Sequence, residues 1–200
     1  MKSLDEYLRD AEQAHGHLCA GQVLGVRLAM LGLQKLGIDD PRGKDRKRLV
    51  TFVEIDRCAT DAVAVVAGCR LGKRALKFRD WGKMAATFVD LQAATGAEHW
   101  YRGIRIAAKE SSKAKARSMH PEIENKNQQQ MLAYREMSDD DLFATEWVKV
   151  ELRPEEFPGY KGERIVCEAC GEGINFGREV RREGKTLCRA CSGDRYYEPV

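Results

Sequence analysis

The sequence predicts an α+β protein, in which a mixed helix and antiparallel-sheet domain is followed by a small four-cysteine zinc ribbon. Three observations lead to this fold class. Two Cys-x-x-Cys pairs lie late in the chain, a segment with two prolines and a glycine precedes them, and the region before it alternates between helical apolar periods and β-branched runs. We therefore expect an α+β domain over 1–152, a linker over 153–164 and a ribbon over 165–200.

The ribbon is the strongest local signal. Seventeen residues separate its two Cys-x-x-Cys pairs, whose members are Cys167, Cys170, Cys188 and Cys191. This spacing allows four thiolates to close tetrahedrally on one zinc ion, and Gly171 and Gly193 supply the positive φ that such turns often need. Disulfides fit less well, because nothing in the sequence suggests export. We expect a structural zinc.

Composition and charge indicate an ordinary globular protein. A hydrophobic fraction of 43% over 200 residues is enough for a core, and 34 basic against 31 acidic residues give a net charge of only +3. The acidic N-terminus lacks the features of a signal peptide, and the longest apolar run, 62–67, is too short to span a bilayer. We expect a cytoplasmic protein without membrane contact, whose seven cysteines are metal ligands, reactive thiols or core residues rather than disulfide partners.

The charge balance also argues against a nucleic-acid partner. Two basic clusters, 42–48 and 109–117, could contact phosphates, but they are more typical of solvated loops or helix faces. The ribbon has nearly equal numbers of basic and acidic residues, and four zinc-bound thiolates would make it net negative. A DNA-binding finger therefore has little electrostatic support.

A ligand-rich segment lies near the start of the chain. A short amphipathic helix after Ser3 leads into His15, His17 and Cys19, three metal-ligand residue types within five positions. The following segment, 21–36, is apolar on nearly every side, which predicts a core helix. Its glycines suggest that another backbone comes close to it. On residue chemistry alone, the two histidines fit an ordinary helix end as well as they fit a metal site.

A predicted strand over 48–56 precedes Cys58, and a predicted buried helix extends from there to Cys69. Eleven residues of helix span roughly 16 Å, which is too far for both thiols to bind one ion. Cys58, at the end of the helix that favours a thiolate, is the better ligand. Cys69 is more typical of a packed thiol in the core.

The remaining elements are predicted from local patterns. Residues 75–81 and 83–91 resemble two strands of a hairpin joined at Gly82. Further predicted elements are a strand over 101–108, a helix over 121–137 opened by Pro121, a short helix from Ser138 and an edge strand over 144–152. His99 and His120 stand alone, which favours structural roles.

Two motifs carry a family resemblance. His15-Gly-His-Leu-Cys-Ala-Gly21 is followed by Cys58-Ala-Thr-Asp-Ala-Val-Ala-Val-Val-Ala-Gly-Cys-Arg-Leu-Gly-Lys73 and by Asp80-Trp-Gly-Lys83. Over roughly residues 10 to 150 the chain resembles the FmdE family of formylmethanofuran dehydrogenase proteins, many of whose members carry a similar zinc finger. The family commonly has proline where this chain has Ala20.

The resemblance implies an α+β domain, often dimeric, with a metal site built from both motifs. Carried onto this chain, it gives His17, Cys19 and Cys58 as the best ligands, with His15 and Asp61 as reserve ligands or groups that orient them. One imidazole and two thiolates suit a second divalent ion, zinc above all, with a coordination position left open. The family name implies association with a molybdenum or tungsten dehydrogenase.

Two classes of function remain open. The preferred one is a metal-binding accessory protein, a homodimer whose ribbon docks onto a partner protein. The alternative is a metal-dependent or thiol redox enzyme that uses the open position or Cys19. No complete catalytic constellation is visible, because only Glu54 and Asp61 offer themselves as general bases. Phosphate-loop, dinucleotide and nucleophile-elbow motifs are absent from the sequence.

Overall fold

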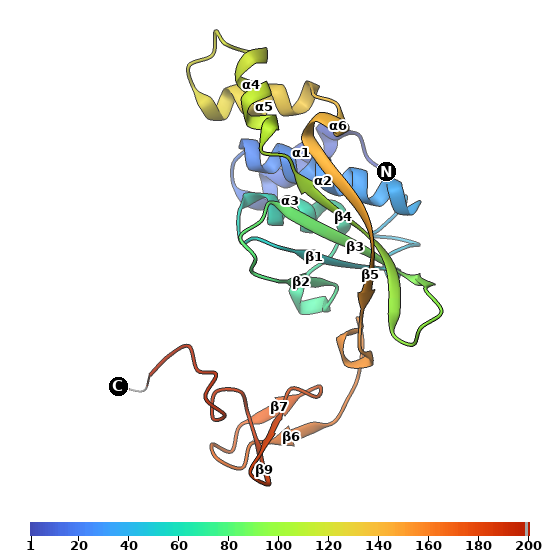
Figure 1. The fold of residues 1–200 in the computed structure, drawn as a ribbon, viewed down its shortest axis with the longest axis vertical. Coiled ribbons are helices and arrows are strands. Elements are labelled where there is room, and N and C mark those ends of the chain that lie inside the picture. The colour runs from blue at the N-terminus through green and yellow to red at the C-terminus, as the bar shows by residue number, and fades with distance from the viewer. Residues whose placement is uncertain (199) are drawn as a thin grey trace. The chain divides into compact units, whose positions relative to one another are not determined.

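A computed structural model describes residues 1–198 and 200. The chain forms two compact units, Met1–Leu152 and Arg153–Val200 (Figure 1). Among the helices of the described residues, none combines the length and the apolar character that crossing a bilayer demands.

The first unit is built on a five-stranded sheet in the order β2-β1-β3-β4-β5. All neighbouring strands run antiparallel except β1 and β2, which are parallel. The prediction of an edge strand near residue 144 is confirmed, because β5 pairs only with β4 within the sheet. The strands are β1 (Leu49–Val53), β2 (Leu76–Phe78), β3 (Ala85–Ala94), β4 (Trp100–Ala108) and β5 (Phe143–Glu151).

The predicted hairpin between β2 and β3 is wrong, because β1 lies between these two strands. The chain passes over the end of β1 at this point: the backbone N–H groups of Trp81 and Lys83 both donate to the carbonyl of Glu54. Since β1 is an interior strand of the sheet, both of its edges need partners. β2 satisfies one edge in parallel, after the crossover through α3 (Cys58–Ala67) and the short 3-10 turn η1 (Leu71–Lys73), and β3 satisfies the other.

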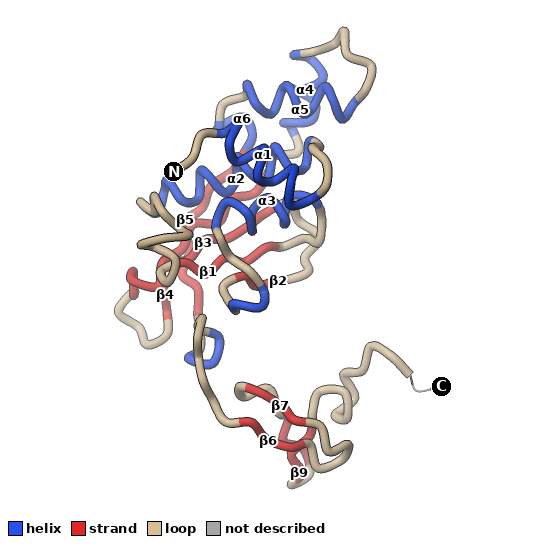
Figure 2. The backbone as a smooth tube through the Cα atoms, turned by 180° about the vertical axis from the view of Figure 1, so that it is seen from behind, coloured by secondary structure: helices blue, strands red, loops and turns tan. Residues whose placement is uncertain are grey.

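Three helices cover one face of the sheet: α1 (Leu4–His15), α2 (Ala20–Leu36) and α3. They lie behind the sheet in Figure 1 and in front of it in the reverse view of Figure 2. The predicted helix after Ser3 is α1, which begins with a capping box between Ser3 and Glu6, and α2 is the buried core helix that its composition predicts. The core between helices and sheet contains Leu28, Phe88 and Ile104, each almost completely buried.

Three further helices lie beyond the sheet: α4 (Ser111–Met119), α5 (Lys126–Glu136) and α6 (Asp139–Leu142). The helix expected from Pro121 begins only at Lys126, because the side chain of Asn125 caps it by accepting from Gln128 N–H. Arg27 of α2 holds this region in place. Its guanidinium donates to the carbonyls of Tyr134 and Met137 and pairs with Asp139 at 2.6 Å.

The second unit begins with a 3-10 turn, η2 (Pro154–Glu156), and contains two short antiparallel hairpins. The first hairpin pairs β6 (Arg164–Val166) with β7 (Gly173–Asn175), and the second pairs β8 (Val180–Arg182) with β9 (Lys185–Leu187). One Cys-x-x-Cys pair follows β6 and the other follows β9. The positive φ expected at Gly171 and Gly193 is confirmed, at 75° and 106°.

Candidate metal centres

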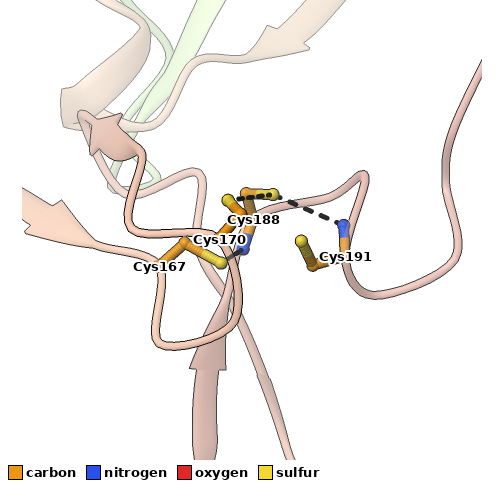
Figure 3. A group of neighbouring side chains, drawn as sticks. All are labelled: Cys167, Cys170, Cys188 and Cys191. Atoms are coloured by element: carbon orange, nitrogen blue, oxygen red, sulfur yellow. Dashed lines mark hydrogen bonds between the residues drawn. The ribbon is translucent and has the colours of Figure 1, made fainter. Parts of the chain in front are cut away.

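The four ribbon cysteines converge on one point (Figure 3). Their sulfur atoms, from Cys167, Cys170, Cys188 and Cys191, all lie within 4.8 Å of one another. Tetrahedral zinc with Zn–S bonds of about 2.3 Å places its sulfurs about 3.8 Å apart, so this cluster needs little adjustment to hold the ion. The four thiols fit a structural zinc site.

Backbone N–H groups of the ribbon donate hydrogen bonds to cysteine sulfurs, which favours the thiolate form. The N–H of Cys188 donates to Cys167 Sγ at 3.2 Å, and the N–H of Cys191 donates to Cys188 Sγ at 3.4 Å (Figure 3). The first of these bonds is the main reason that the pKa of Cys167 falls to about 6. A side-chain hydrogen bond with Cys188 is the main reason that the pKa of Cys191 rises to about 12. Four thiolates held this close together repel one another, and a divalent cation would supply the positive charge that offsets this repulsion.

The second cluster lies where α1 ends and α2 begins. One ligand atom from each of His15, His17 and Cys19 lies within 4.8 Å of the others. Gly16 ends α1 in the left-handed conformation, with φ of 95°, which turns the chain sharply between the two histidines. Cys19 is the N-cap residue of α2 but its side chain makes no capping hydrogen bond. Its sulfur is therefore not engaged in capping the helix.

Cys58 is outside this group of three but adjoins it from α3. Burial raises the pKa of the Cys58 thiol, and the neighbouring Cys19 thiol raises it further. Gly21 makes this approach possible, because a Cβ at that position would lie 3.1 Å from Cys58 Cβ and 3.7 Å from Cys19 Sγ. The structure thus brings the two predicted thiol ligands together at the starts of adjacent helices.

The two carboxylates considered as general bases are both engaged. Asp61 contacts His15 Nδ1 at 2.8 Å, which leaves Nε2 of that ring for a metal. Glu54 is buried and binds Arg105 through two hydrogen bonds of 2.7 Å. Arg105 thus occupies both oxygens of this carboxylate in a bidentate pair. Of the two, Asp61 is the one that contacts a member of the cluster, and there it can orient the ring of His15.

Two residues next to the cluster were not predicted. The Nε2 of Gln22 donates to the backbone carbonyl of Cys58 at 2.6 Å, and Oδ1 of Asn127 accepts from the N–H of Ala20 at 2.9 Å. Gln22 could have been noticed as a polar residue in an otherwise apolar segment. Nothing local indicates Asn127, which lies 107 positions from its partner.

The other cysteine and the isolated histidines lie outside both clusters. Cys69 is almost fully buried near the Thr51 hydroxyl, and burial raises its pKa to about 11. The prediction that it is a packed thiol is confirmed. His120 contacts the carboxylates of Glu122 and Glu136, and His99 contacts Glu98. These are local ion contacts rather than parts of a metal cluster.

Known proteins resemble the chain along nearly its whole length. A tungsten formylmethanofuran dehydrogenase FmdE-like protein from Syntrophus aciditrophicus has the same fold, with a TM-score of 0.62, 22% identity and coverage of 98% of this chain and 96% of its own. A protein of Archaeoglobus fulgidus named "Probable S-adenosyl-L-methionine-binding protein" is 30% identical over 219 aligned positions. That alignment covers 98% of this chain but 55% of the relative, so the chain spans about half the relative's length.

Two family matches cover the two units. Residues 160–197 match the prokaryotic dksA/traR C4-type zinc finger, which agrees with the predicted ribbon and with its sulfur cluster. Residues 14–144 match FmdE, described as "Molybdenum formylmethanofuran dehydrogenase operon", and this range includes the whole N-terminal cluster. Because the second match extends over more than half of the sequence, the chain belongs to the FmdE family and carries a C4-type zinc finger after its FmdE domain.

Proposed function

We propose that the protein is a metal-binding accessory protein with two metal sites. In the first unit, His15, His17, Cys19 and Cys58 hold a divalent ion, for which zinc is the first candidate. In the second unit, the four ribbon cysteines hold a structural zinc. The observation that carries this proposal is the convergence of imidazole and thiol groups at the start of α2, within 4.8 Å of one another.

The ligand chemistry supports zinc in the first site. Imidazole and thiolate together are a common zinc donor set, and they exclude hard ions such as magnesium that prefer oxygen. The contact between Asp61 and His15 has the form of the carboxylate–histidine pairs that fix ligand orientation in zinc proteins. His17 is the exposed member of the cluster, so a metal held there is within reach of a partner.

A carrier, storage or sensing role is favoured over catalysis. Metal-assisted hydrolysis needs a free base next to the metal-bound water. Glu54 binds Arg105 and Asp61 contacts His15, so each of these two carboxylates already has a side-chain partner in the protein.

The ribbon is the part of the chain that we assign to docking. We infer that it docks the protein, as a homodimer, onto a partner protein. The FmdE description points to a molybdenum formylmethanofuran dehydrogenase as the first partner to test. The Archaeoglobus relative supports no ligand for this chain, because its name describes a protein of which the chain spans about half.

The test is metal content per chain, measured by plasma emission on purified full-length protein. We expect about two equivalents in the wild type. Cys19→Ser should lose the equivalent bound in the first unit, and Cys170→Ser should lose the one bound in the ribbon. Cys69→Ala is the matched control, because it removes a buried thiol outside both clusters and should retain both metals. A Cys19→Ser variant that keeps both equivalents would refute the first site.

A further inference from the structure

Gln22 is an unusual residue for its position. It lies in the first turn of α2, is fully buried at 0% exposure, and is surrounded in the helix by apolar residues. Its amide reaches across to the neighbouring helix, where Nε2 donates to the carbonyl oxygen of Cys58 at 2.6 Å. Cys58 is the first residue of α3. The bond therefore joins the first turns of two helices.

The other half of the amide has no partner. Gln22 Oε1 is buried and accepts no hydrogen bond from the residues that the structure describes. An unpaired buried acceptor destabilises a protein by at least as much as one neutral hydrogen bond stabilises it. A methionine of similar volume would fill the same space without this penalty. Global stability is thus a poor explanation for a glutamine here.

Local positioning is a better explanation. Cys19 precedes Gln22 by one helical turn, and the carbonyl that Gln22 holds belongs to the other thiol residue of the cluster. We propose that Gln22 is a positioning residue of the first metal site, which fixes the Cys58 thiol beside Cys19 and so brings the fourth ligand to the ion. This inference rests on the proposed function. It adds a residue that binds no metal itself and acts through Cys58.

The test compares Gln22→Met with wild type as full-length protein. Zinc affinity is measured by competition with a chromophoric chelator, and cobalt(II) is used to record thiolate-to-metal charge-transfer bands. We expect the first site to bind zinc at least tenfold more weakly in the variant, with bands reduced towards those of Cys58→Ser. The urea midpoint should stay close to the wild-type value, and the ribbon site of the same chain serves as an internal reference.

Gln129→Met is the matched control. Gln129 is also a buried glutamine, and its Nε2 donates to the carbonyls of His120 and Ile123, away from the metal ligands. Its amide contributes two hydrogen bonds, so the variant should be less stable than wild type while its zinc affinity and cobalt spectrum stay unchanged. Gln22→Met is therefore expected to weaken zinc binding without loss of stability, and Gln129→Met to lose stability without weaker zinc binding.

The outcomes separate the two proposals. A wild-type protein that binds only the ribbon metal refutes the first site itself. A wild type with two metals and a Gln22→Met variant of equal affinity and spectrum overturns the role of Gln22 alone. If the variant does not fold, side-chain amide NMR of the wild type decides: zinc loading should slow hydrogen exchange at Gln22 Nε2, and exchange that is unaffected by zinc contradicts the proposal.

Discussion

Gly25 of α2 packs directly against the backbone of Ala59 in α3. A Cβ added at Gly25 would lie 2.5 Å from the carbonyl oxygen of Ala59 and 2.8 Å from its Cα. Only a hydrogen atom fits in this space, so the two helices approach as closely as their backbones allow. This approach places the start of α3, with Cys58, beside the start of α2, with Cys19.

Gly25→Ala is expected to force α2 and α3 apart. The added methyl group meets backbone atoms that have no rotamer to adopt, so we expect a loss of about 1–3 kcal/mol of unfolding free energy, measured by urea denaturation. Zinc affinity at the first site should fall as well, because Cys58 moves away from Cys19. Gly72→Ala is the control, since nothing lies within 4 Å of a Cβ there. An unchanged midpoint in Gly25→Ala would mean that the helices can separate without cost.

The close approach of α2 was predictable because glycine in a buried helix has few other uses. The hairpin at Gly82 was predicted wrongly, because it was inferred from the local sequence alone. Local turn chemistry shows that the chain reverses, but it does not show which strand the second segment joins. That choice depends on β1, whose two edges both require partners. The partner of a strand therefore depends on all the strands of the sheet and cannot be predicted from the turn that precedes it.

The metal ligands also differ in how far they could be predicted from local sequence. The ribbon ligands and the segment from His15 to Cys19 are recognisable because their spacing is local. Cys58 lies 39 positions beyond Cys19, and only the family resemblance joined it to the other ligands. The hydrogen bond of Asn127 spans 107 positions, so no pattern within one segment contains it.

Asn127 is expected to steady the N-terminus of α2. Cys19 makes no side-chain capping bond, and Oδ1 of Asn127 instead accepts from the N–H of Ala20. Loss of such a capping interaction costs about 0.5–2 kcal/mol. Asn127→Ala should show this loss in urea unfolding and faster amide exchange at Ala20. Gln130→Ala on the same helix is the control, and equal exchange in both variants would argue against the cap.

Arg27 is expected to hold the last helices of the first unit. Its side chain is mostly buried, and it satisfies carbonyl groups at the end of α5 as well as Asp139. Arg27→Met should leave these groups unpaired and reduce stability by roughly 2–4 kcal/mol. Hydrogen exchange by mass spectrometry should increase most over 126–142. The exposed Arg117→Met provides the control, and uniform protection in Arg27→Met would contradict this role.

Cys69 gives a pH dependence of known sign. Burial raises the pKa of its thiol from 9.0 to about 11, so the unfolded chain loses this proton at lower pH than the folded chain does. The stabilising contribution is complete below pH 9 and is lost as the pH rises towards 11. Wild type should therefore lose up to about 2 kcal/mol more than Cys69→Ala between these pH values, measured by urea unfolding. Parallel curves for the two proteins would contradict the burial argument.

The ribbon is expected to depend on its metal for folding. Among the described residues of the second unit, only Cys167 and Ile174 are buried apolar side chains, which is too small a core for independent stability. Binding of zinc must then supply most of the folding free energy.

Excess chelator should make residues 165–198 susceptible to limited proteolysis while the first unit, with its own core, stays resistant. Cys170→Ser should give the same fragment pattern without chelator, whereas Lys185→Ala, on the exposed surface of β9, should stay resistant until metal is removed. A ribbon that resists protease after complete metal removal would show that hydrogen bonds between its strands suffice.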